Sequence, residues 1–241
     1  MSFLNKTAVI IVTFNISNLI SKQIELIKRF CKDDHDIIVV DNSNNLNVAN
    51  DIKNIVNSLN CNYLKTNSPS DFSESHATAC NFAYKQFCKT YKYILLLDHD
   101  NFPTEDFKVS SVIIDKVIGG TGQKRGAIYY YWPGCLMINN ELIDTDMVDF
   151  STNPRLSLDT GGNLYKIVEK YKFEKCVNFD QYEIYDTNDI NYGFYNNICA
   201  PSTCSSKFTF MHFINASNWN NKENNETRIN RLLGILNERI K

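Results

Sequence analysis

In the N-terminal part of the chain, short apolar runs alternate with longer amphipathic stretches. This alternation is typical of strands separated by crossover helices in a parallel sheet. The pattern predicts strands over residues 7–14, 36–40, 61–65 and 93–97, and helices over residues 18–31, 48–59 and 73–90. We therefore expect the α/β class, with a mostly parallel sheet flanked by helices and right-handed crossovers.

The pattern changes in the second half of the chain. The glycine-rich stretch over residues 119–126 cannot continue a helix, and it leads into an aromatic strand expected over residues 127–132. Pro133-Gly134 is predicted to turn the chain before another apolar strand over residues 135–138. The remaining elements expected are a helix over residues 161–171 and a strand over residues 208–213.

An apolar stripe at helical spacing marks the C-terminal end of the chain. Its members are Ile229, Leu232, Leu233, Leu236 and Ile240. The stripe predicts an amphipathic helix within residues 221–241 that packs on the rest of the protein. Because no Pro-, Gly- or Ser-rich linker and no internal repeat divides the sequence, we expect a single domain over residues 1–241.

Composition and charge narrow the class of partner. The 25 Lys+Arg and 27 Asp+Glu give a net charge of -2 with no long basic run, so nucleic acid is not an expected partner. The apolar stretch over residues 8–14 is too short to span a bilayer, and we expect no transmembrane segment. The eight cysteines are scattered without a CxxC pair, as is typical of reduced thiols, and we expect a cytoplasmic protein.

Polar side chains follow each of the four predicted N-terminal strands. In strand order they are Thr13 and Asn15, then Asp41, then Asn67, and finally Asp98 and Asp100. Ligands of an open parallel sheet bind beyond the carboxyl ends of its strands, so we expect these side chains to face one ligand site. The alternative is that Asp41 and Asn67 only start turns and cap helices.

Asp98-x-Asp100 is the most informative of these groups. Two carboxylates directly after an apolar strand are costly to place together without a cation. Mn2+ or Mg2+ takes oxygen ligands and commonly bridges protein carboxylates to substrate phosphates, so the pair suits a nucleoside diphosphate. The alternative is that residues 100–103 form no more than a turn.

Three motifs together resemble the GT-A glycosyltransferases, especially family two: TFN at 13–15, VVDNSNN at 39–45 and LLLDHDN at 95–101. The resemblance covers residues 7–138 well. It implies a GT-A (Rossmann-like) fold and transfer of a sugar from a nucleotide-sugar donor to a saccharide or glycoconjugate acceptor. Residues 1–101 then form the nucleotide-binding half and residues 102–220 the acceptor-binding half.

The resemblance also implies roles for the residues at the strand ends. Asp41 is expected to contact the base or ribose, Asp98 the ribose and diphosphate, and Asp100 the metal. Thr13, Asn15 and Asn67 are placed on the donor side with them. The correspondence is looser for Asn67 and for Asn81, because the glycines usual in that segment of the family are missing.

Beyond residue 138 the resemblance is thinner, but it suggests a catalytic base. Asp159 lies at the corresponding position, where a carboxylate deprotonates the acceptor hydroxyl and the transfer inverts the configuration. The alternative is that Asp159 is a helix N-cap before Gly161. The sequence lacks the Gln-x-x-Arg-Trp motif of processive synthases, which favours a single-transfer enzyme over a polymerase. The resemblance implies a hexosyl- or deoxyhexosyltransferase.

Two later residues complete the predicted site. His212 lies in an apolar strand and is a candidate metal ligand, the alternative being a hydrogen-bonded core histidine. Trp132, beside Pro133-Gly134, is a candidate acceptor contact. Lys124 and Arg125 either close over phosphate or form an exposed hairpin tip.

Three other functions compete with glycosyl transfer. A degenerate GT-A domain would bind a carbohydrate or protein partner without catalysis. An Asp-x-Asp phosphohydrolase would form a phospho-aspartate, although residues 101–103 do not follow the usual sequence of that class. A sugar-phosphate nucleotidyltransferase needs a Gly- and Arg-rich loop after the first strand, and residues 13–17 supply none.

Overall fold

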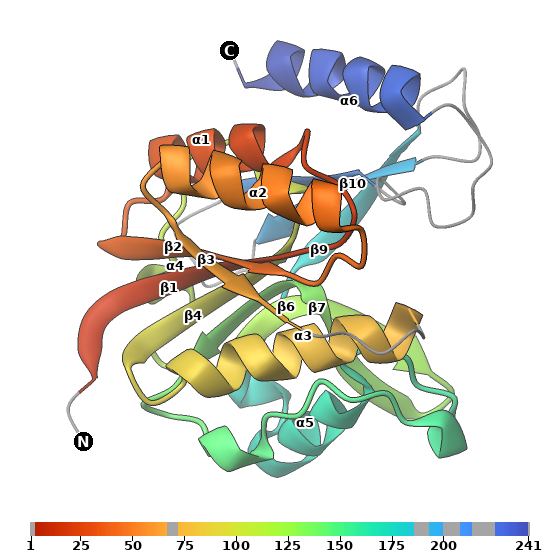
Figure 1. Ribbon diagram of the computed structural model, residues 1–241. Coiled ribbons are helices and arrows are strands. Elements are labelled where there is room, and N and C mark those ends of the chain that lie inside the picture. The colour runs from red at the N-terminus through yellow and green to blue at the C-terminus, as the bar shows by residue number, and fades with distance from the viewer. Residues whose placement is uncertain (1–2, 67–71, 186–192, 200–207, 214–224, 241) are drawn as a thin grey trace.

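The computed structural model describes residues 3–66, 72–185, 193–199, 208–213 and 225–240 (Figure 1). Its helices are α1 (Ile20–Phe30), α2 (Leu46–Ser58), α3 (Phe72–Phe87), α4 (Val109–Val112), α5 (Tyr165–Tyr171) and α6 (Asn225–Arg239). Its strands are β1 (Leu4–Thr13), β2 (His35–Asp41), β3 (Asn62–Lys65), β4 (Tyr91–Asp98), β5 (Asn101–Pro103), β6 (Ile118–Arg125), β7 (Ile128–Asn139), β8 (Cys176–Asn178), β9 (Asp180–Tyr185), β10 (Gly193–Cys199) and β11 (Phe208–Phe213).

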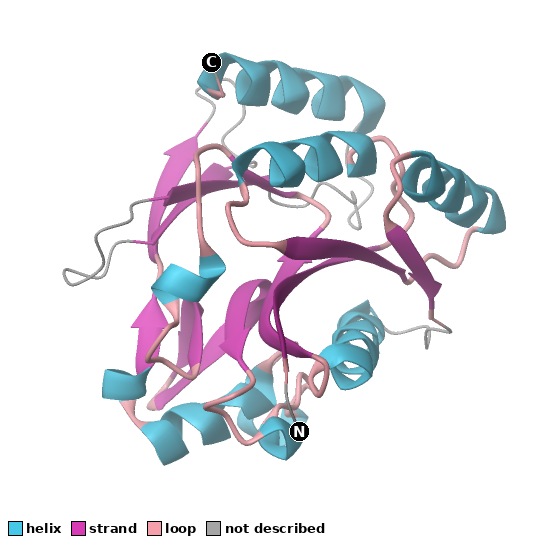
Figure 2. Cartoon of the chain, turned by 90° about the vertical axis from the view of Figure 1, so that its left-hand side faces the viewer, coloured by secondary structure: helices cyan, strands magenta, loops and turns pink. Residues whose placement is uncertain are grey.

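A seven-stranded sheet with the order β3-β2-β1-β4-β7-β6-β8 forms the centre of the protein. Strands β1 to β4 are mutually parallel, and β7 runs antiparallel to both of its neighbours. Helices α1 and α2 lie on one side of this sheet, and α3 and α5 lie on the other (Figures 1 and 2). The predicted α/β class, with a mostly parallel sheet between helices, is therefore confirmed.

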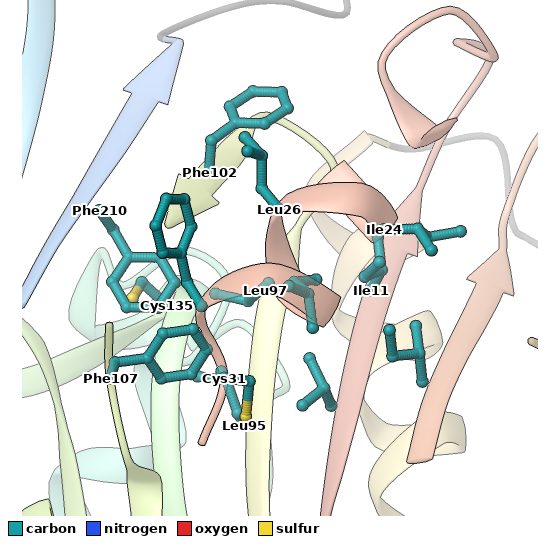
Figure 3. Packing of buried hydrophobic residues seen from close by; sticks show 14 of the residues in the cluster. Ile11, Ile24, Leu26, Cys31, Leu95, Leu97, Phe102, Phe107, Cys135 and Phe210 are labelled. Carbon is teal, nitrogen blue, oxygen red and sulfur yellow. The ribbon is translucent and has the colours of Figure 1, made fainter. Parts of the chain in front are cut away.

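The apolar runs build this sheet because they are buried on both faces. Residues 8–11 of β1 and residues 94–97 of β4 are at most 1% exposed. Ile11 and Leu97 point toward α1, which closes that side with Ile24 and Leu26 (Figure 3). Strands covered by helices on both faces read as continuous hydrophobic runs, which is why the sequence identified them.

A second, antiparallel sheet with the order β5-β11-β10-β9 was not predicted. Its first strand, β5, begins directly after Asp100, and its neighbour β11 confirms the late strand expected over residues 208–213. Pairing of β5 with β11 sets His212 opposite Asn101. This second sheet therefore brings a residue from the end of the chain to the Asp-x-Asp segment.

Pro133-Gly134 does not turn the chain, so that prediction was wrong. Both predicted apolar runs belong to one strand, β7, which forms a hairpin with β6 around residues 126–127. Thr121 pairs with Trp132 and Gly120 with Leu136, so residues 133–135 bulge out of the ladder opposite β6. A bulge accommodates Pro133 because proline has no N–H to donate to the ladder.

The C-terminal helix is confirmed as amphipathic. Ile229, Leu232, Leu236 and Ile240 are buried in the same apolar cluster as α1, and Leu233 is partly buried against it. Among the described residues, no helix combines the length and apolar character that crossing a bilayer requires. The division of the domain into donor and acceptor halves remains a prediction.

Candidate functional site

The carboxyl ends of β1, β2 and β4 bring three predicted site residues to one edge of the sheet. Thr13 pairs with Asp41, and Val12, one residue before Thr13, pairs with Asp98. Because adjacent parallel strands lie about 5 Å apart, these residues occupy neighbouring positions. Asn67 was predicted to join them but lies outside the described residues.

Asn15 joins the chain after β1 to the turn after β2. Its Oδ1 accepts hydrogen bonds from the backbone N–H groups of Asn44 at 3.2 Å and Asn45 at 3.1 Å. Its backbone lies in the left-handed region with a φ of 51°, which Asn tolerates better than most residues. Thr13, on the strand itself, donates its hydroxyl to the Ile16 carbonyl at 3.2 Å. Both side chains thus shape the edge of the site.

Asp41 is fully buried, and both of its carboxylate oxygens are engaged. Oδ1 accepts from the Ser43 backbone N–H at 2.8 Å, and Oδ2 accepts from the Tyr63 hydroxyl at 2.7 Å. Burial and the Asp41 carboxylate raise the pKa of Tyr63 above its ordinary value, which keeps the phenol a donor. These contacts fit the turn-forming alternative for Asp41, and its contact with a donor remains a prediction.

Asp98 is held by a histidine that the sequence analysis did not identify. His76 on α3 places Nε2 2.7 Å from Asp98 Oδ1, and its side chain is only a quarter exposed. Burial disfavours the charged imidazole, but the Asp98 carboxylate outweighs burial and raises the pKa of His76 well above its ordinary value. One carboxylate oxygen of Asp98 is therefore engaged by the His76 imidazole.

Asp100 and His212 form a second, more deeply buried pair. Asp100 Oδ1 lies 3.4 Å from His212 Nε2, and the two residues are 6% and 9% exposed. Burial disfavours the carboxylate, but the charge interaction with His212 outweighs it and lowers the pKa of Asp100. Asp100 Oδ1 accepts no hydrogen bond from the described residues. A buried oxygen in that position can serve as a cation ligand.

The predicted metal residues are thus brought together, although they do not form a closed cage. No cluster of three or more His, Cys, Asp or Glu side chains suited to a metal ion occurs in the described part of the chain. Mg2+ and related ions are commonly bound by one or two protein ligands together with substrate phosphates. Asp100 and His212 fit that kind of site, with the remaining ligands coming from outside the protein.

The bulge in β7 connects the residues of this site. The Trp132 ring stacks on the His212 ring, with centroids 4.8 Å apart. A Cβ on Gly134 would lie 2.5 Å from Asp98 Oδ2 and 2.0 Å from the Trp132 ring, so only glycine fits there without displacement. The Gly134 carbonyl accepts a hydrogen bond from Asn101 Nδ2 at 2.7 Å. Gly134, which the sequence predicted to lie in a turn, therefore packs against Asp98 and Trp132 and is bonded to Asn101.

Asp159 is positioned by Tyr130 and is not a helix cap. Its Oδ1 accepts from the Tyr130 hydroxyl at 2.9 Å, and its Oδ2 lies 4.0 Å from the Arg125 guanidinium. Its side chain is about half exposed, at 49%. The short helix that follows is preceded by Gly161, with a φ of 83°, so the N-cap alternative is wrong. A half-exposed carboxylate is accessible to an acceptor.

The Asp159 loop packs against the same elements that hold the carboxylate pair. Thr160 donates its hydroxyl to the Ser73 carbonyl at 3.0 Å, three residues before His76 on α3. A Cβ on Gly161 would lie 2.9 Å from Pro133, the residue beside Gly134. His76 on α3 contacts Asp98 at 2.7 Å, and Gly134 in the bulge packs beside the same carboxylate. The loop that carries the predicted base therefore contacts the same two elements that adjoin Asp98.

Several residues of the site gave little signal in the sequence. His76 lies on a helix without a motif, and Gly134 was read as a turn residue. Gln23 was detectable, because it is the polar residue on an otherwise apolar face of α1. Asn81 anchors the loop before Asp159, since its Oδ1 accepts from the Phe150 N–H at 2.9 Å. Arg125 is at the exposed hairpin tip that the sequence offered as one alternative.

Comparisons with known proteins give only distant likenesses. No protein-family model and no curated protein sequence matches this chain. The mannosyltransferase PcManGT from Pyrobaculum calidifontis, solved with GDP-Man and Mn2+, is 13% identical, with a TM-score of 0.49 over 73% of this chain and 55% of that one. The glycosyltransferase GlyE from Streptococcus pneumoniae TIGR4 is 15% identical, with a TM-score of 0.41 over 71% of this chain and 44% of that one.

TarS from S. aureus is 15% identical, with a TM-score of 0.40 over 60% of this chain and 30% of that one. This chain therefore spans 55% or less of the length of these three proteins. Likenesses this distant do not assign a substrate or a mechanism to this chain.

Proposed function

We propose that this protein is a GT-A-type glycosyltransferase that moves a sugar from a nucleoside-diphosphate donor to a hydroxyl of a saccharide or glycoconjugate. The observation that carries the proposal is the buried Asp100–His212 pair beside Asp98 at the carboxyl edge of the sheet. The motif resemblance at residues 13–15, 39–45 and 95–101 supports it independently.

On the donor side, Asp100 and His212 would hold Mn2+ or Mg2+, with diphosphate oxygens as further ligands. A bound divalent ion would stabilise the negative charge that develops on the departing diphosphate. Asp98 keeps Oδ1 on His76, which leaves Oδ2 to orient the ribose or diphosphate. Thr13, Asn15, Asp41 and Asn67 are proposed to line the nucleoside side.

On the acceptor side, Asp159 would act as the general base. Its carboxylate takes the proton of the acceptor hydroxyl, and the hydroxyl oxygen forms a bond to the anomeric carbon as the bond to the diphosphate oxygen breaks. Attack from the face opposite the diphosphate inverts the configuration. The Tyr130 hydroxyl fixes one oxygen of the base at 2.9 Å, and Trp132 is proposed to contact the acceptor sugar.

Burial and the Asp159 hydrogen bond raise the pKa of Tyr130 to about 12. Tyr130 therefore remains a hydrogen-bond donor at neutral pH and does not compete with Asp159 for the acceptor proton. The Arg125 guanidinium lies 4.0 Å from the other oxygen of Asp159.

The Asp-x-Asp phosphohydrolase alternative has less support. A phospho-aspartate mechanism requires a carboxylate that can attack a phosphoryl group. Asp98 has one oxygen on His76, and Asp100 is only 6% exposed and paired with His212. The non-catalytic alternative is the more serious rival, and it differs from the proposal in retaining binding while losing turnover.

Turnover of nucleotide sugars tests the proposal directly. The protein is incubated with UDP-, GDP- and dTDP-sugars in Mn2+ or in EDTA, and release of the nucleoside diphosphate is measured. Release from one class of donor that requires the metal would support the transferase. Binding of a donor without any release, with and without simple saccharide acceptors, would favour the degenerate binding domain.

A further inference from the structure

Gln23 is a fully buried polar residue on a helix face that otherwise supplies the apolar core. On α1 it lies among Ile20, Ile24 and Ile27, each of which is also 0% exposed. Its amide Nε2 donates to the Asp98 carbonyl at 2.7 Å and to the Asn101 carbonyl at 2.6 Å. Both amide hydrogens are therefore used on the two ends of one four-residue segment.

That segment carries both carboxylates of the proposed donor site. Asp98 and Asp100 lie within it, and its last residue, Asn101, donates from Nδ2 to the Gly134 carbonyl at 2.7 Å. Asn101 also pairs with His212 across β5 and β11. Gln23 thus ties α1 to the segment at the point where β4, the β7 bulge and the second sheet meet.

Retaining an amide at this position is not explained by packing. Gln23 Oε1 is buried and has no hydrogen-bond partner among the described residues, and the same holds for Asn101 Oδ1. A buried polar atom left unpaired opposes folding, and leucine or methionine would fill a similar volume on this apolar face. The two donated hydrogen bonds are what distinguishes glutamine from those residues.

We propose that Gln23 is a positioning residue that sets the relative placement of Asp98 and Asp100 for binding the metal and diphosphate. The inference rests on the proposed glycosyltransferase function, since it assigns Gln23 a part in the same donor site. Gln23 itself touches no substrate, and it acts by fixing the backbone carbonyls on either side of the pair. Its loss should therefore change donor binding more than the catalytic step.

Two variants and a matched control test this role. Gln23→Met keeps the volume and removes both donated hydrogen bonds, and Gln23→Glu keeps the shape but replaces the amide donor. The control is Asn139→Leu, because Asn139 is also 0% exposed and donates its amide to a backbone carbonyl, that of Ile113, at 2.9 Å. Asn139 pairs with Tyr93 near the start of β4, far along the strand from Asp98.

The readouts are the Kd of UDP, GDP and dTDP in Mn2+ by titration calorimetry, the donor KM and kcat, and the thermal unfolding midpoint. Two lost hydrogen bonds predict a rise in Kd and donor KM of about tenfold or more for Gln23→Met, with kcat changed less than donor KM. Asn139→Leu should lower the unfolding midpoint and leave Kd within about twofold.

Each result decides a different question. If none of the three nucleotides binds to the unaltered protein, the proposed function fails and Gln23 is not the cause. If the unaltered protein binds and folded Gln23→Met binds as tightly, the positioning role is wrong. If Gln23→Met does not fold, the Kd of folded Gln23→Glu tests the positioning role in the same way. Equal losses of affinity in the Gln23 and Asn139 variants would show that general destabilisation causes the effect and would contradict the positioning role.

Discussion

Trp132 stacks its indole ring on the imidazole of His212, with ring centroids 4.8 Å apart and an interplanar angle of 38°. The two residues come from different sheets, β7 and β11, and Asp100 lies 3.4 Å from the same imidazole. The stack therefore joins the proposed acceptor contact to the proposed metal ligand. The proposed donor and acceptor subsites would therefore meet where the two sheets adjoin.

Two substitutions of Trp132 test whether an aromatic ring at this position binds the acceptor sugar. We expect Trp132→Ala to raise the acceptor KM by about tenfold or more, because an aromatic contact with a sugar is lost. Trp132→Phe keeps an aromatic ring and should retain most of the affinity. Initial rates at saturating donor give both values, and an unchanged acceptor KM in the alanine variant would remove Trp132 from the acceptor site.

Removal of the proposed base should affect turnover and spare binding. Asp159→Asn keeps a side chain of the same shape that can still accept from Tyr130, but it cannot take a proton. We expect kcat to fall by about 10²–10⁴-fold, with the Kd for nucleoside diphosphate in Mn2+ unchanged. Single-turnover rates and calorimetry test this together, and normal transfer by the variant would show that another group is the base.

Tyr130→Phe tests the residue that orients the proposed base, Asp159. The variant keeps the ring and loses the hydroxyl that donates to Asp159 Oδ1 at 2.9 Å. Since only the orientation of the base is altered, we expect kcat to fall by about tenfold or less and donor affinity to be retained. A larger loss than that of Asp159→Asn would be inconsistent with a supporting role.

The glycine at the bulge should be far more sensitive than a glycine elsewhere. A Cβ on Gly134 would come within 2.5 Å of Asp98 Oδ2 and 2.0 Å of Trp132, so Gly134→Ala should displace at least one of them and weaken donor binding. The control is Gly234→Ala on α6, where no atom lies within 4 Å of the added carbon. Alanine there should stabilise the helix by up to about 1 kcal/mol.

Unfolding and calorimetry on both glycine variants check this contrast. The bulge variant is expected to show a raised Kd for nucleoside diphosphate in Mn2+, and the α6 variant an unchanged one. Equal affinities would mean that the close packing of Gly134 does not control the position of Asp98.

The hydrogen bonds of Asp149 predict that the stability of the protein depends on pH. Burial opposes its ionisation, but hydrogen bonds from Ser151, Asn163 and Asn81 outweigh burial and lower its pKa. A lowered folded-state pKa contributes stability above the unfolded value of about 3.9, and that stability is lost as pH falls through the folded value.

Asp149→Asn should therefore be less stable than the unaltered protein at pH 7, by about 1 kcal/mol or more, since hydrogen bonds to a charged group are lost. The difference should shrink as the pH falls below about 3.9 and through the lower pKa of folded Asp149, because the protonated carboxyl no longer accepts hydrogen bonds as a charged group. Urea unfolding at a series of pH values measures it, and a difference that does not vary with pH would contradict this account.

The sequence predicted the parts of the fold that depend on local pattern. The apolar runs of β1 and β4 are buried between two layers of helices, so their hydrophobicity is continuous and easily read. Asp98 and Asp100 could be placed because Asp98 ends β4 and Asp100 follows two residues later. Helix α6 could be predicted as well, because the residues that repeat at helical spacing are the ones buried against the core.

The remaining parts depend on pairings between distant segments. The second sheet joins β5, of three residues, to strands more than a hundred positions later, and no local signal marks so short a strand. The role of His76 follows from its 2.7 Å contact with Asp98, which the sequence of α3 does not contain. The bulge at Pro133-Gly134 arises from its pairing with β6, and the same dipeptide alone is more typical of a turn.

The most direct test of the central claim is calorimetric titration of UDP, GDP and dTDP into the purified protein, with and without Mn2+, alongside Asp100→Ala. The account predicts that at least one nucleotide binds only with the metal and that Asp100→Ala abolishes this binding while its thermal unfolding remains cooperative. Metal-dependent binding that survives in folded Asp100→Ala, or no binding of any nucleotide to the unaltered protein, would contradict the assignment of this edge of the sheet as a donor site.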